Sequence, residues 1–159
     1  MTQDVDPNLR ARCEALIADC AHAIDDDKLE SWPDFFAEAC KYRVTTRENH
    51  DRGLPLSLVY CDGRGMMADR ISALRIANIY EPHVYCHILG PSRVTREGGA
   101  LRARTNFSVI RTMASGDAFI FATGRCLDEI VEDGGALKFR ERLVVLDSRQ
   151  VDTLMVIPI

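Results

Sequence analysis

The segment LRARTNFSVIRTM, residues 101–113, decides the fold, because apolar and polar residues alternate over most of its length. In a strand, such alternation sends successive side chains to opposite faces of the sheet. One face then carries Leu101, Ala103, Thr105, Phe107, Val109 and Met113, and the other carries Arg102, Arg104, Asn106 and Ser108. The pattern predicts a strand with one apolar face and one polar face.

Two segments of the same character follow, AFIFATGRCLDEIV at residues 118–131 and LKFRERLVVLDS at residues 137–148. The stretches REGGA (96–100), ASGD (114–117) and EDGGA (132–136) border these runs. Each offers glycine where a tight reversal needs positive φ. We therefore expect the strands to be joined as successive hairpins of an antiparallel sheet.

The N-terminal half has the other periodicity. Apolar residues recur at spacings of three and four, and so predict a helix with one buried stripe: Leu9, Cys13, Leu16, Ile17, Cys20 and Ile24. A second, short helix is expected at ESWPDFFAEAC (30–40), strands at KYRVTTREN (41–49) and PLSLVYCD (55–62), and a third helix at GRGMMADRISALRIA (63–77). This is an α+β layout, with a curved antiparallel sheet wrapped around the N-terminal helices. We expect one domain over residues 1–159, with a flexible N-terminus at about residues 1–8.

Composition excludes several classes of protein. The 159 residues carry a formal net charge of −4 without a basic block, which disfavours nucleic-acid binding. No apolar run approaches the ~20 residues that span a bilayer, so no membrane segment is expected. The six cysteines form no CxxC pair, and the N-terminus does not resemble a signal peptide. We therefore expect reduced thiols and a cytoplasmic protein.

The segment NIYEPHVYCHILG, residues 78–90, raises the question of a metal site, because it contains His83, Cys86 and His87. On a helix, the two histidines would share a face. On a strand, four residues separate their Cα atoms by roughly 13 Å, too far for one metal ion. The composition after Pro82 favours a strand, with His83, Tyr85 and His87 on one face and Val84, Cys86 and Ile88 on the other. The sequence then predicts a half-buried or contact surface here.

Other motifs for catalysis or cofactor binding are missing from the sequence. It contains no GxGxxG, GxxxxGK[ST], HExxH or GxSxG, and no paired cysteines and histidines of the Rieske type. His22 and His50 are expected at the surface. The run Asp25–Asp27 follows the first helix and is expected to be a solvated helix exit, since a helix C-terminus disfavours anions.

Two charged groups are expected to form buried ion pairs. Arg70 lies near the edge of the apolar stripe of the third helix, so we expect it to be partly buried and paired with a carboxylate, with ligand contact as the alternative. In FRERL (139–143), Glu141 alternates with Arg140 and Arg142 and falls on the face of Phe139 and Leu143. A carboxylate among core residues needs a partner, and Arg125 on a neighbouring strand is the candidate.

The order of these elements resembles the small (beta) subunit of bacterial aromatic-ring-hydroxylating dioxygenases, the Rieske non-haem iron oxygenases. The resemblance is carried by AIDDDKLESWPDFFAEACKYRV (23–44), the whole of residues 47–90, GRCLDEIV (124–131) and residues 137–159, and is strongest to the terephthalate-dioxygenase and salicylate-hydroxylase types. It implies a cystatin-like or NTF2-like cone and a structural, non-catalytic role.

The same resemblance implies that the partner large (alpha) subunit carries the Rieske two-iron cluster, the mononuclear Fe(II) and the substrate pocket. Electrons would come from NAD(P)H through a reductase, and three large subunits would assemble with three small ones, with contacts between small subunits. The substrate would be an aromatic carboxylate. Its identity, and the choice between dioxygenation and monohydroxylation, stay open.

Candidate interface residues follow from side-chain type alone: Trp32, Tyr80, His83, Tyr85 and His87. A rival interpretation is a stand-alone isomerase or dehydratase of the same cone fold, for which Asp25, Asp69 and His87 are the first candidates. A third is a small-molecule-binding module, which a cone filled by Trp32, Phe35, Phe36 and Met67 would exclude.

Overall fold

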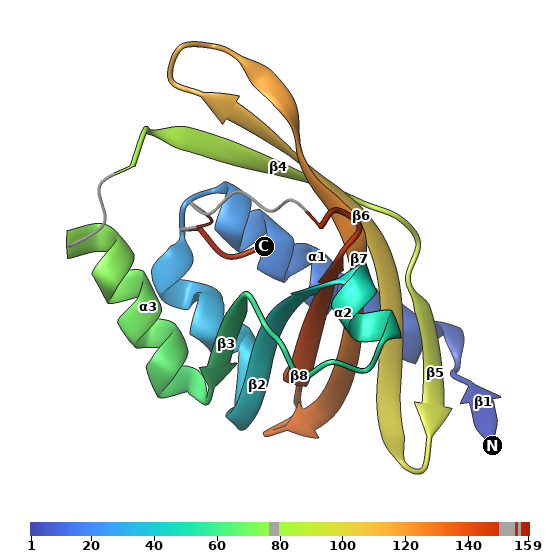
Figure 1. Cartoon of the computed structure of the whole chain (residues 1–159). Helices are drawn as coiled ribbons and strands as arrows, with labels where there is room; N and C mark the ends of the chain where they lie inside the picture. Colours follow the sequence, from blue (N-terminus) through green and yellow to red (C-terminus); the bar gives the residue numbers. More distant parts are fainter. Residues whose placement is uncertain (77–79, 150–154, 156) are drawn as a thin grey trace.

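The computed structural model describes residues 1–76, 80–149, 155 and 157–159, and it has an α+β architecture. The two long helices lie on the inner side of a strongly curved sheet (Figure 1). The elements in chain order are β1 (Thr2–Asp4), α1 (Pro7–Asp25), the 3-10 helix η1 (Leu29–Phe35), β2 (Phe36–Thr46), α2 (Arg47–Asp51), β3 (Val59–Asp62), α3 (Arg64–Ile76), β4 (His83–Leu89), β5 (Arg93–Glu97), β6 (Ala100–Met113), β7 (Ala118–Asp133) and β8 (Ala136–Leu146).

The described strands form one sheet in the order β1-β5-β6-β7-β8-β2-β3, with β4 also paired to β6. The hairpins predicted around β6, β7 and β8 are confirmed, and Gly98, Gly99, Gly116, Gly134 and Gly135 all have positive φ. One pairing departs from the expected antiparallel pattern, because β2 runs parallel to β8. Strand β2 follows η1 in the chain and is not joined to β8 by a hairpin. The two strands are therefore free to run parallel.

Helix α1 begins where the sequence predicts it. The Asp6 carboxylate accepts the backbone N–H groups of Asn8 and Leu9 at 3.0 and 3.1 Å, and Pro7 occupies the first turn. The buried stripe is the predicted one, with Cys13, Leu16, Ile17, Cys20 and Ile24 all inside. Burial of this stripe against the sheet fixes the helix within the cone.

Several segments differ from the sequence expectations, among them the strand expected at 55–62, which begins only at Val59. Residues 2–4, expected to be flexible, pair with β5 as strand β1. The second helix ends at Phe35, and residues 36–40 begin β2, because Phe36 and Cys40 are needed in the core. The strand expected at 41–49 ends at Thr46, whose hydroxyl accepts the N–H of Asn49 at 3.2 Å and caps helix α2. The last residue expected in the third helix, Ala77, lies outside the described residues.

Aromatic side chains fill the inside of the cone. Trp32 contacts Phe36 and Tyr42 edge-on, with ring centroids 5.9 and 4.9 Å apart, and Phe36 packs on Phe139 at 5.2 Å. The Tyr42 hydroxyl donates to the carbonyl of Ile159 at 2.9 Å and accepts its N–H at 3.1 Å. The last described residues therefore close the interior rather than leaving it open.

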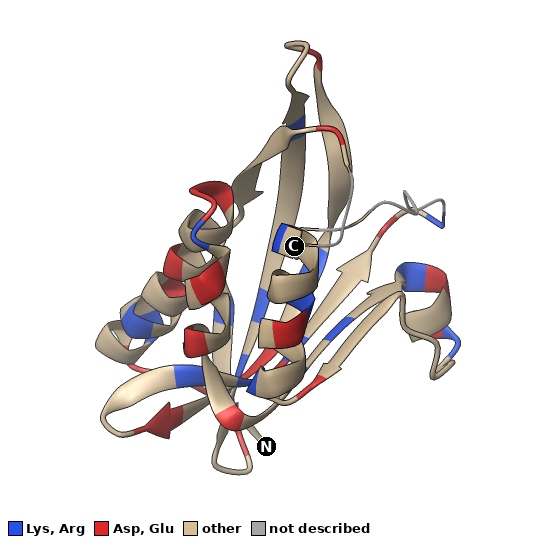
Figure 2. Cartoon of the chain, turned by 90° about the vertical axis from the view of Figure 1, so that its left-hand side faces the viewer, with Lys and Arg blue, Asp and Glu red and all other residues tan. Residues whose placement is uncertain are grey.

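Charged residues are spread over both helices and strands (Figure 2). No described helix is long and apolar enough to cross a membrane.

Candidate functional site

Strand β4 shows the predicted alternation, but its two faces are used the other way round. His83, Tyr85 and His87 point toward the helices, whereas Val84 and Ile88 are 60% and 53% exposed and Cys86 is also exposed. The reason is the position of β4, which pairs with β6 on one side and packs over helix α1 with its inner face. The histidine face is therefore internal, and the apolar face is the one that solvent reaches.

On this inner face, Asp25 and His87 form a closely coupled pair. The His87 Nδ1 atom lies 2.6 Å from Asp25 Oδ1, and the His87 backbone N–H donates to Oδ2 at 2.8 Å. Because an ionised carboxylate only accepts, Nδ1 donates the hydrogen bond to Asp25. The His87 side chain is only 5% exposed, and Nε2 has no hydrogen-bond partner among the described residues. The prediction that Asp25 is exposed to solvent at the end of α1 is wrong, because Asp25 lies at the edge of the buried face of this helix.

The neighbouring side chains make this end of the cone aromatic. His83 Nδ1 is 2.8 Å from the carbonyl of Glu81, and its ring lies 5.5 Å from Tyr80 and 5.4 Å from Tyr85. Tyr85 stacks on Phe121 at 5.4 Å. A cavity of about 250 Å³ lies beside them, lined by Asp25, Asp27, Tyr80, His83 and Tyr85 together with aliphatic residues. This cavity is smaller than the clefts that usually hold small molecules.

The proposed interface residues are distributed differently from the expectation. Trp32 is fully buried and Tyr85 is 5% exposed, so neither can meet a partner protein at the surface. Tyr80 and His83 are half-buried, and the His87 side chain is only 5% exposed. Side-chain type predicted contact residues here, but the same aromatic character equally suits the interior of a cone.

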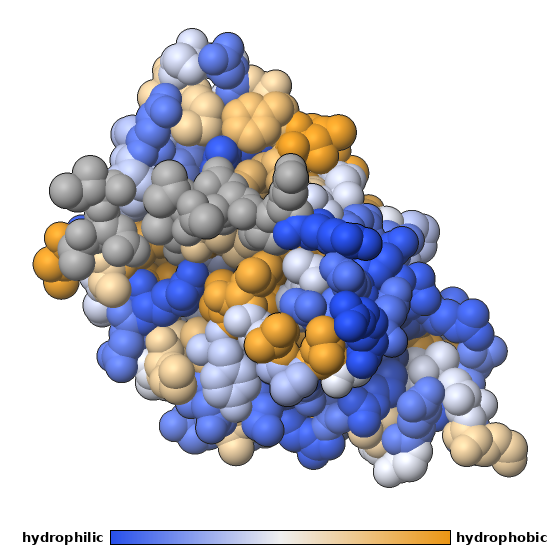
Figure 3. All heavy atoms as spheres, viewed as in Figure 1, coloured by the Kyte–Doolittle hydropathy of each residue, from blue (hydrophilic) through white to orange (hydrophobic). Residues whose placement is uncertain are grey.

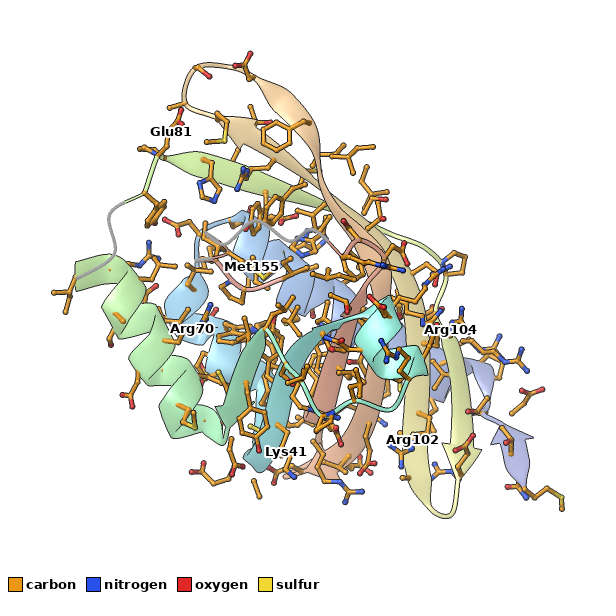
Figure 4. The ribbon with its side chains drawn as sticks, in the orientation of Figure 1. Lys41, Arg70, Glu81, Arg102, Arg104 and Met155 are labelled. Atoms are coloured by element: carbon orange, nitrogen blue, oxygen red, sulfur yellow. The ribbon has the colours of Figure 1, made fainter. Side chains whose placement is uncertain are left out.

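Arg70 is half-buried, as predicted, and the partner that the structure describes is a carbonyl. Its guanidinium donates to the backbone oxygen of Met155 at 2.9 Å, which ties helix α3 to the C-terminal segment (Figure 4). Asp69, the neighbouring candidate for the rival enzyme, is exposed on the outside of α3. The structure therefore does not bring Asp69 to the Asp25–His87 pair.

The expected pairing of Glu141 with Arg125 is wrong. Glu141 binds Arg43 at 2.8 Å on the outer face of the sheet, while the nearest described carboxylate to Arg125 is Asp51, at 3.8 Å. The cause is a β-bulge in β8, where Ile130 pairs with Phe139 but Glu129 pairs with Glu141. The extra residue, Arg140, inverts the alternation beyond it.

The same bulge turns Arg142 into the core, where it forms the buried ion pair that the sequence interpretation missed. Its Nε and Nη2 donate to the two oxygens of Asp128 at 2.9 and 3.1 Å, and both residues are almost inaccessible. Burial raises the pKa of the Asp128 carboxyl, and the adjacent Arg142 opposes this rise. The sequence contains a signal for this buried carboxylate, since Asp128 falls on the same strand face as the apolar residues Cys126 and Ile130.

The described residues form no cluster of metal ligands. Within the described ranges, no three His, Cys, Asp or Glu side chains are grouped so that they could hold a metal ion. Cys86, the cysteine nearest the two histidines in sequence, lies on the opposite face of β4 from both.

The family model and the curated relatives agree on one kind of protein. The family model described as "Ring hydroxylating beta subunit" matches residues 20–153. Among curated proteins, the chain is 46% identical over 140 residues to the beta 2 subunit of the terminal oxygenase component of terephthalate 1,2-dioxygenase from Comamonas sp., covering 87% of this chain and 91% of that one. It is 36% identical to the anthranilate 1,2-dioxygenase small subunit of Burkholderia cepacia, over 86% and 85% of the two chains.

Solved structures give the same result at the level of the fold. A candidate aromatic-ring-hydroxylating dioxygenase beta subunit from Novosphingobium aromaticivorans superposes with a TM-score of 0.86 at 35% identity, over 95% of this chain and 97% of that one. The benzoate 1,2-dioxygenase beta subunit of Burkholderia mallei superposes with a TM-score of 0.70 at 17% identity, over 91% and 93%. The second likeness concerns the fold alone.

Proposed function

Since this chain belongs to the ring-hydroxylating beta subunit family, we propose that it is a structural, non-catalytic small subunit of an aromatic-ring-hydroxylating dioxygenase of the terephthalate type. The observation that carries the non-catalytic role is the filled cone. Trp32, Phe36 and Met67 are fully buried, and Phe35 packs against this core. The Tyr42 hydroxyl is hydrogen-bonded to Ile159. An interior packed with the chain's own side chains favours rigidity over substrate binding.

The partner in this proposal is a large subunit that carries the Rieske cluster, the mononuclear iron and the substrate pocket, with electrons from NAD(P)H through a reductase. We infer assembly of three large and three small chains in the cytoplasm, acting on an aromatic carboxylate. Relatives named for terephthalate and anthranilate dioxygenases support this substrate class. The described residues do not fit the iron groups, because no three His, Cys, Asp or Glu side chains among them are grouped to hold a metal ion, and Cys86 and the two histidines of β4 point to opposite faces.

One observation favours the rival, an isomerase or dehydratase working in the cone. A carboxylate that orients an imidazole through Nδ1, with Nε2 free of a described partner, is the arrangement of a general base. Access argues against it, because the Nε2 atom is buried and His87 does not line the adjacent cavity. We therefore assign a structural role to the Asp25–His87 pair, which links α1 to β4.

Native mass spectrometry of the protein purified gently from its host, with its partners retained, tests this assignment. We expect the chain to travel in equal copy number with a larger, iron-bearing chain. A protein that travels alone as a small homo-oligomer would contradict the proposal and direct attention to the Asp25–His87 pair.

A further inference from the structure

The outer face of the sheet contains two arginines in an unfavourable arrangement. Arg93 on β5 and Arg104 on β6 are directly opposed across the strand pair, and both are exposed. In the described part of the chain, no carboxylate forms an ion pair with either. Like charges directly opposite one another destabilise a sheet, so this pair costs stability in the isolated chain.

The arginines around this pair, by contrast, each have a carboxylate partner. Arg102 and Arg140 both bind Glu129, and Arg43 binds Glu141 at 2.8 Å. Figure 4 shows Arg102 and Arg104 along β6, away from the cone interior. The arginines of this face that have no described carboxylate partner are therefore Arg93 and Arg104.

The two arginines line a groove that contains leucines as well as the carboxylates of Glu97, Glu129 and Glu141. Its volume is about 510 Å³, and Leu127 and Leu143 lie in it beside Arg102 and Glu129. A groove that combines half-buried leucines with unpaired arginines suits a protein surface that brings apolar side chains and carboxylates together.

Farther along β6 and β7, toward the hairpin that joins them, this outer face becomes apolar. In register with one another on β4, β6 and β7 are Cys86, Ile110 and Ile120, flanked by Val84 and Ile88. Ile120 is 68% exposed. Apolar side chains also gather at the end of the molecule where the β6–β7 hairpin lies (Figure 3). The outer face therefore has a cationic half and an apolar half that share strands β6 and β7.

We propose that this outer face docks the large subunit, and that Arg93 and Arg104 together receive a carboxylate from it. The inference rests on the proposed function. A second copy of this chain is the less suitable occupant, because two-fold pairing through this face would bring the same arginines of both copies together. A large subunit with an acidic, apolar-bordered surface removes the arginine–arginine repulsion and pairs both charges.

The test compares two double variants with the same change in net charge, each assembled with the large subunit. Arg93→Gln/Arg104→Gln removes the proposed contacts. Arg12→Gln/Arg52→Gln removes two exposed arginines, one in α1 and one directly after α2, each paired with one glutamate. We expect the first variant to raise the Kd for the large subunit about tenfold or more and to weaken its salt dependence, and the second to bind like the unmodified chain.

A second readout separates docking from folding. Because removal of the opposed charges relieves repulsion, the isolated Arg93→Gln/Arg104→Gln chain should melt at the same temperature or higher. Unchanged affinity for the large subunit, or a change confined to self-association, would overturn the inference while leaving the proposed function intact. Failure of the unmodified chain to bind any large subunit would instead overturn the proposed function.

Discussion

The Asp25 carboxylate holds His87 at two points, accepting its backbone N–H at 2.8 Å and its ring Nδ1–H at 2.6 Å. Among the described strands, β4 pairs only with β6, so the His87 N–H faces the free edge of the strand. One side chain thus joins the end of α1 to this edge and satisfies a backbone donor that the sheet leaves open.

Replacement of Asp25 by alanine should therefore weaken the fold. Loss of both hydrogen bonds leaves the buried Nδ1–H and the backbone N–H of His87 unsatisfied, which costs about 1–3 kcal/mol of unfolding free energy. Urea unfolding of the isolated chain measures this cost. Asp26→Ala, at the exposed neighbouring position, is the control and should stay within about 0.5 kcal/mol of the unmodified chain. Equal stability of the two variants would show that the link contributes nothing.

Arg142→Met should be among the most damaging single changes to this protein. It leaves Asp128 charged and unpaired in the core, at a cost of about 3–5 kcal/mol. The double variant Arg142→Met/Asp128→Leu removes both charges and should recover most of the loss. Arg43→Met, which breaks the half-exposed pair with Glu141, should cost less than about 1 kcal/mol. Chemical denaturation of all three variants checks the order.

Two glycines should respond to alanine in opposite directions. A Cβ at Gly124 on β7 would lie 2.1 Å from the carbonyl oxygen of Val145 on β8, so the strands would have to separate. We expect Gly124→Ala to lower stability by at least about 2 kcal/mol. Gly65 in helix α3 has open space at this position, and Gly65→Ala should add roughly 0.5–1 kcal/mol. Thermal melting of the two variants gives the sign directly.

Thiol reactivity should single out Cys86. It is exposed, whereas the other five cysteines are buried. Burial raises the pKa of Cys20 to about 11 and that of Cys126 to about 12, so both stay protonated and unreactive at neutral pH. Brief treatment with iodoacetamide, followed by peptide mass spectrometry, should label Cys86 first, and a Cys86→Ser chain should show no fast labelling. Early labelling of Cys20 would contradict the core packing described here.

Sequence periodicity predicted much of the sheet and α1, because both depend on local alternation that burial reinforces. It did not predict which face of β4 is internal, since that depends on where β4 lies relative to α1. His83, Tyr85 and His87 were correctly placed on one face. The half-buried alternative holds for His83, whereas Tyr85 and the His87 side chain are buried and cannot form a contact surface.

The ion pairs of Glu141 and Arg142 on β8 were not predicted correctly, for a different reason. One extra residue at Arg140 exchanges the faces of β8, so Arg142 enters the core and Glu141 leaves it. A bulge of this kind has no reliable local signature in FRERL. The Asp25–His87 contact joins residues 62 positions apart, and no spacing rule along one element could have found it.

The central claim, that this chain supports an oxygenase without catalysing the reaction itself, is tested most directly by separating the subunits of the purified oxygenase and measuring iron and turnover in each. We predict that iron remains with the large subunit and that this chain alone is colourless and inactive toward aromatic carboxylates. Its readdition should restore assembly and activity, and Asp25→Asn or His87→Gln chains should restore the same turnover once assembled. Stoichiometric iron in the separated chain, or loss of turnover in assembled enzyme carrying either variant, would contradict the account.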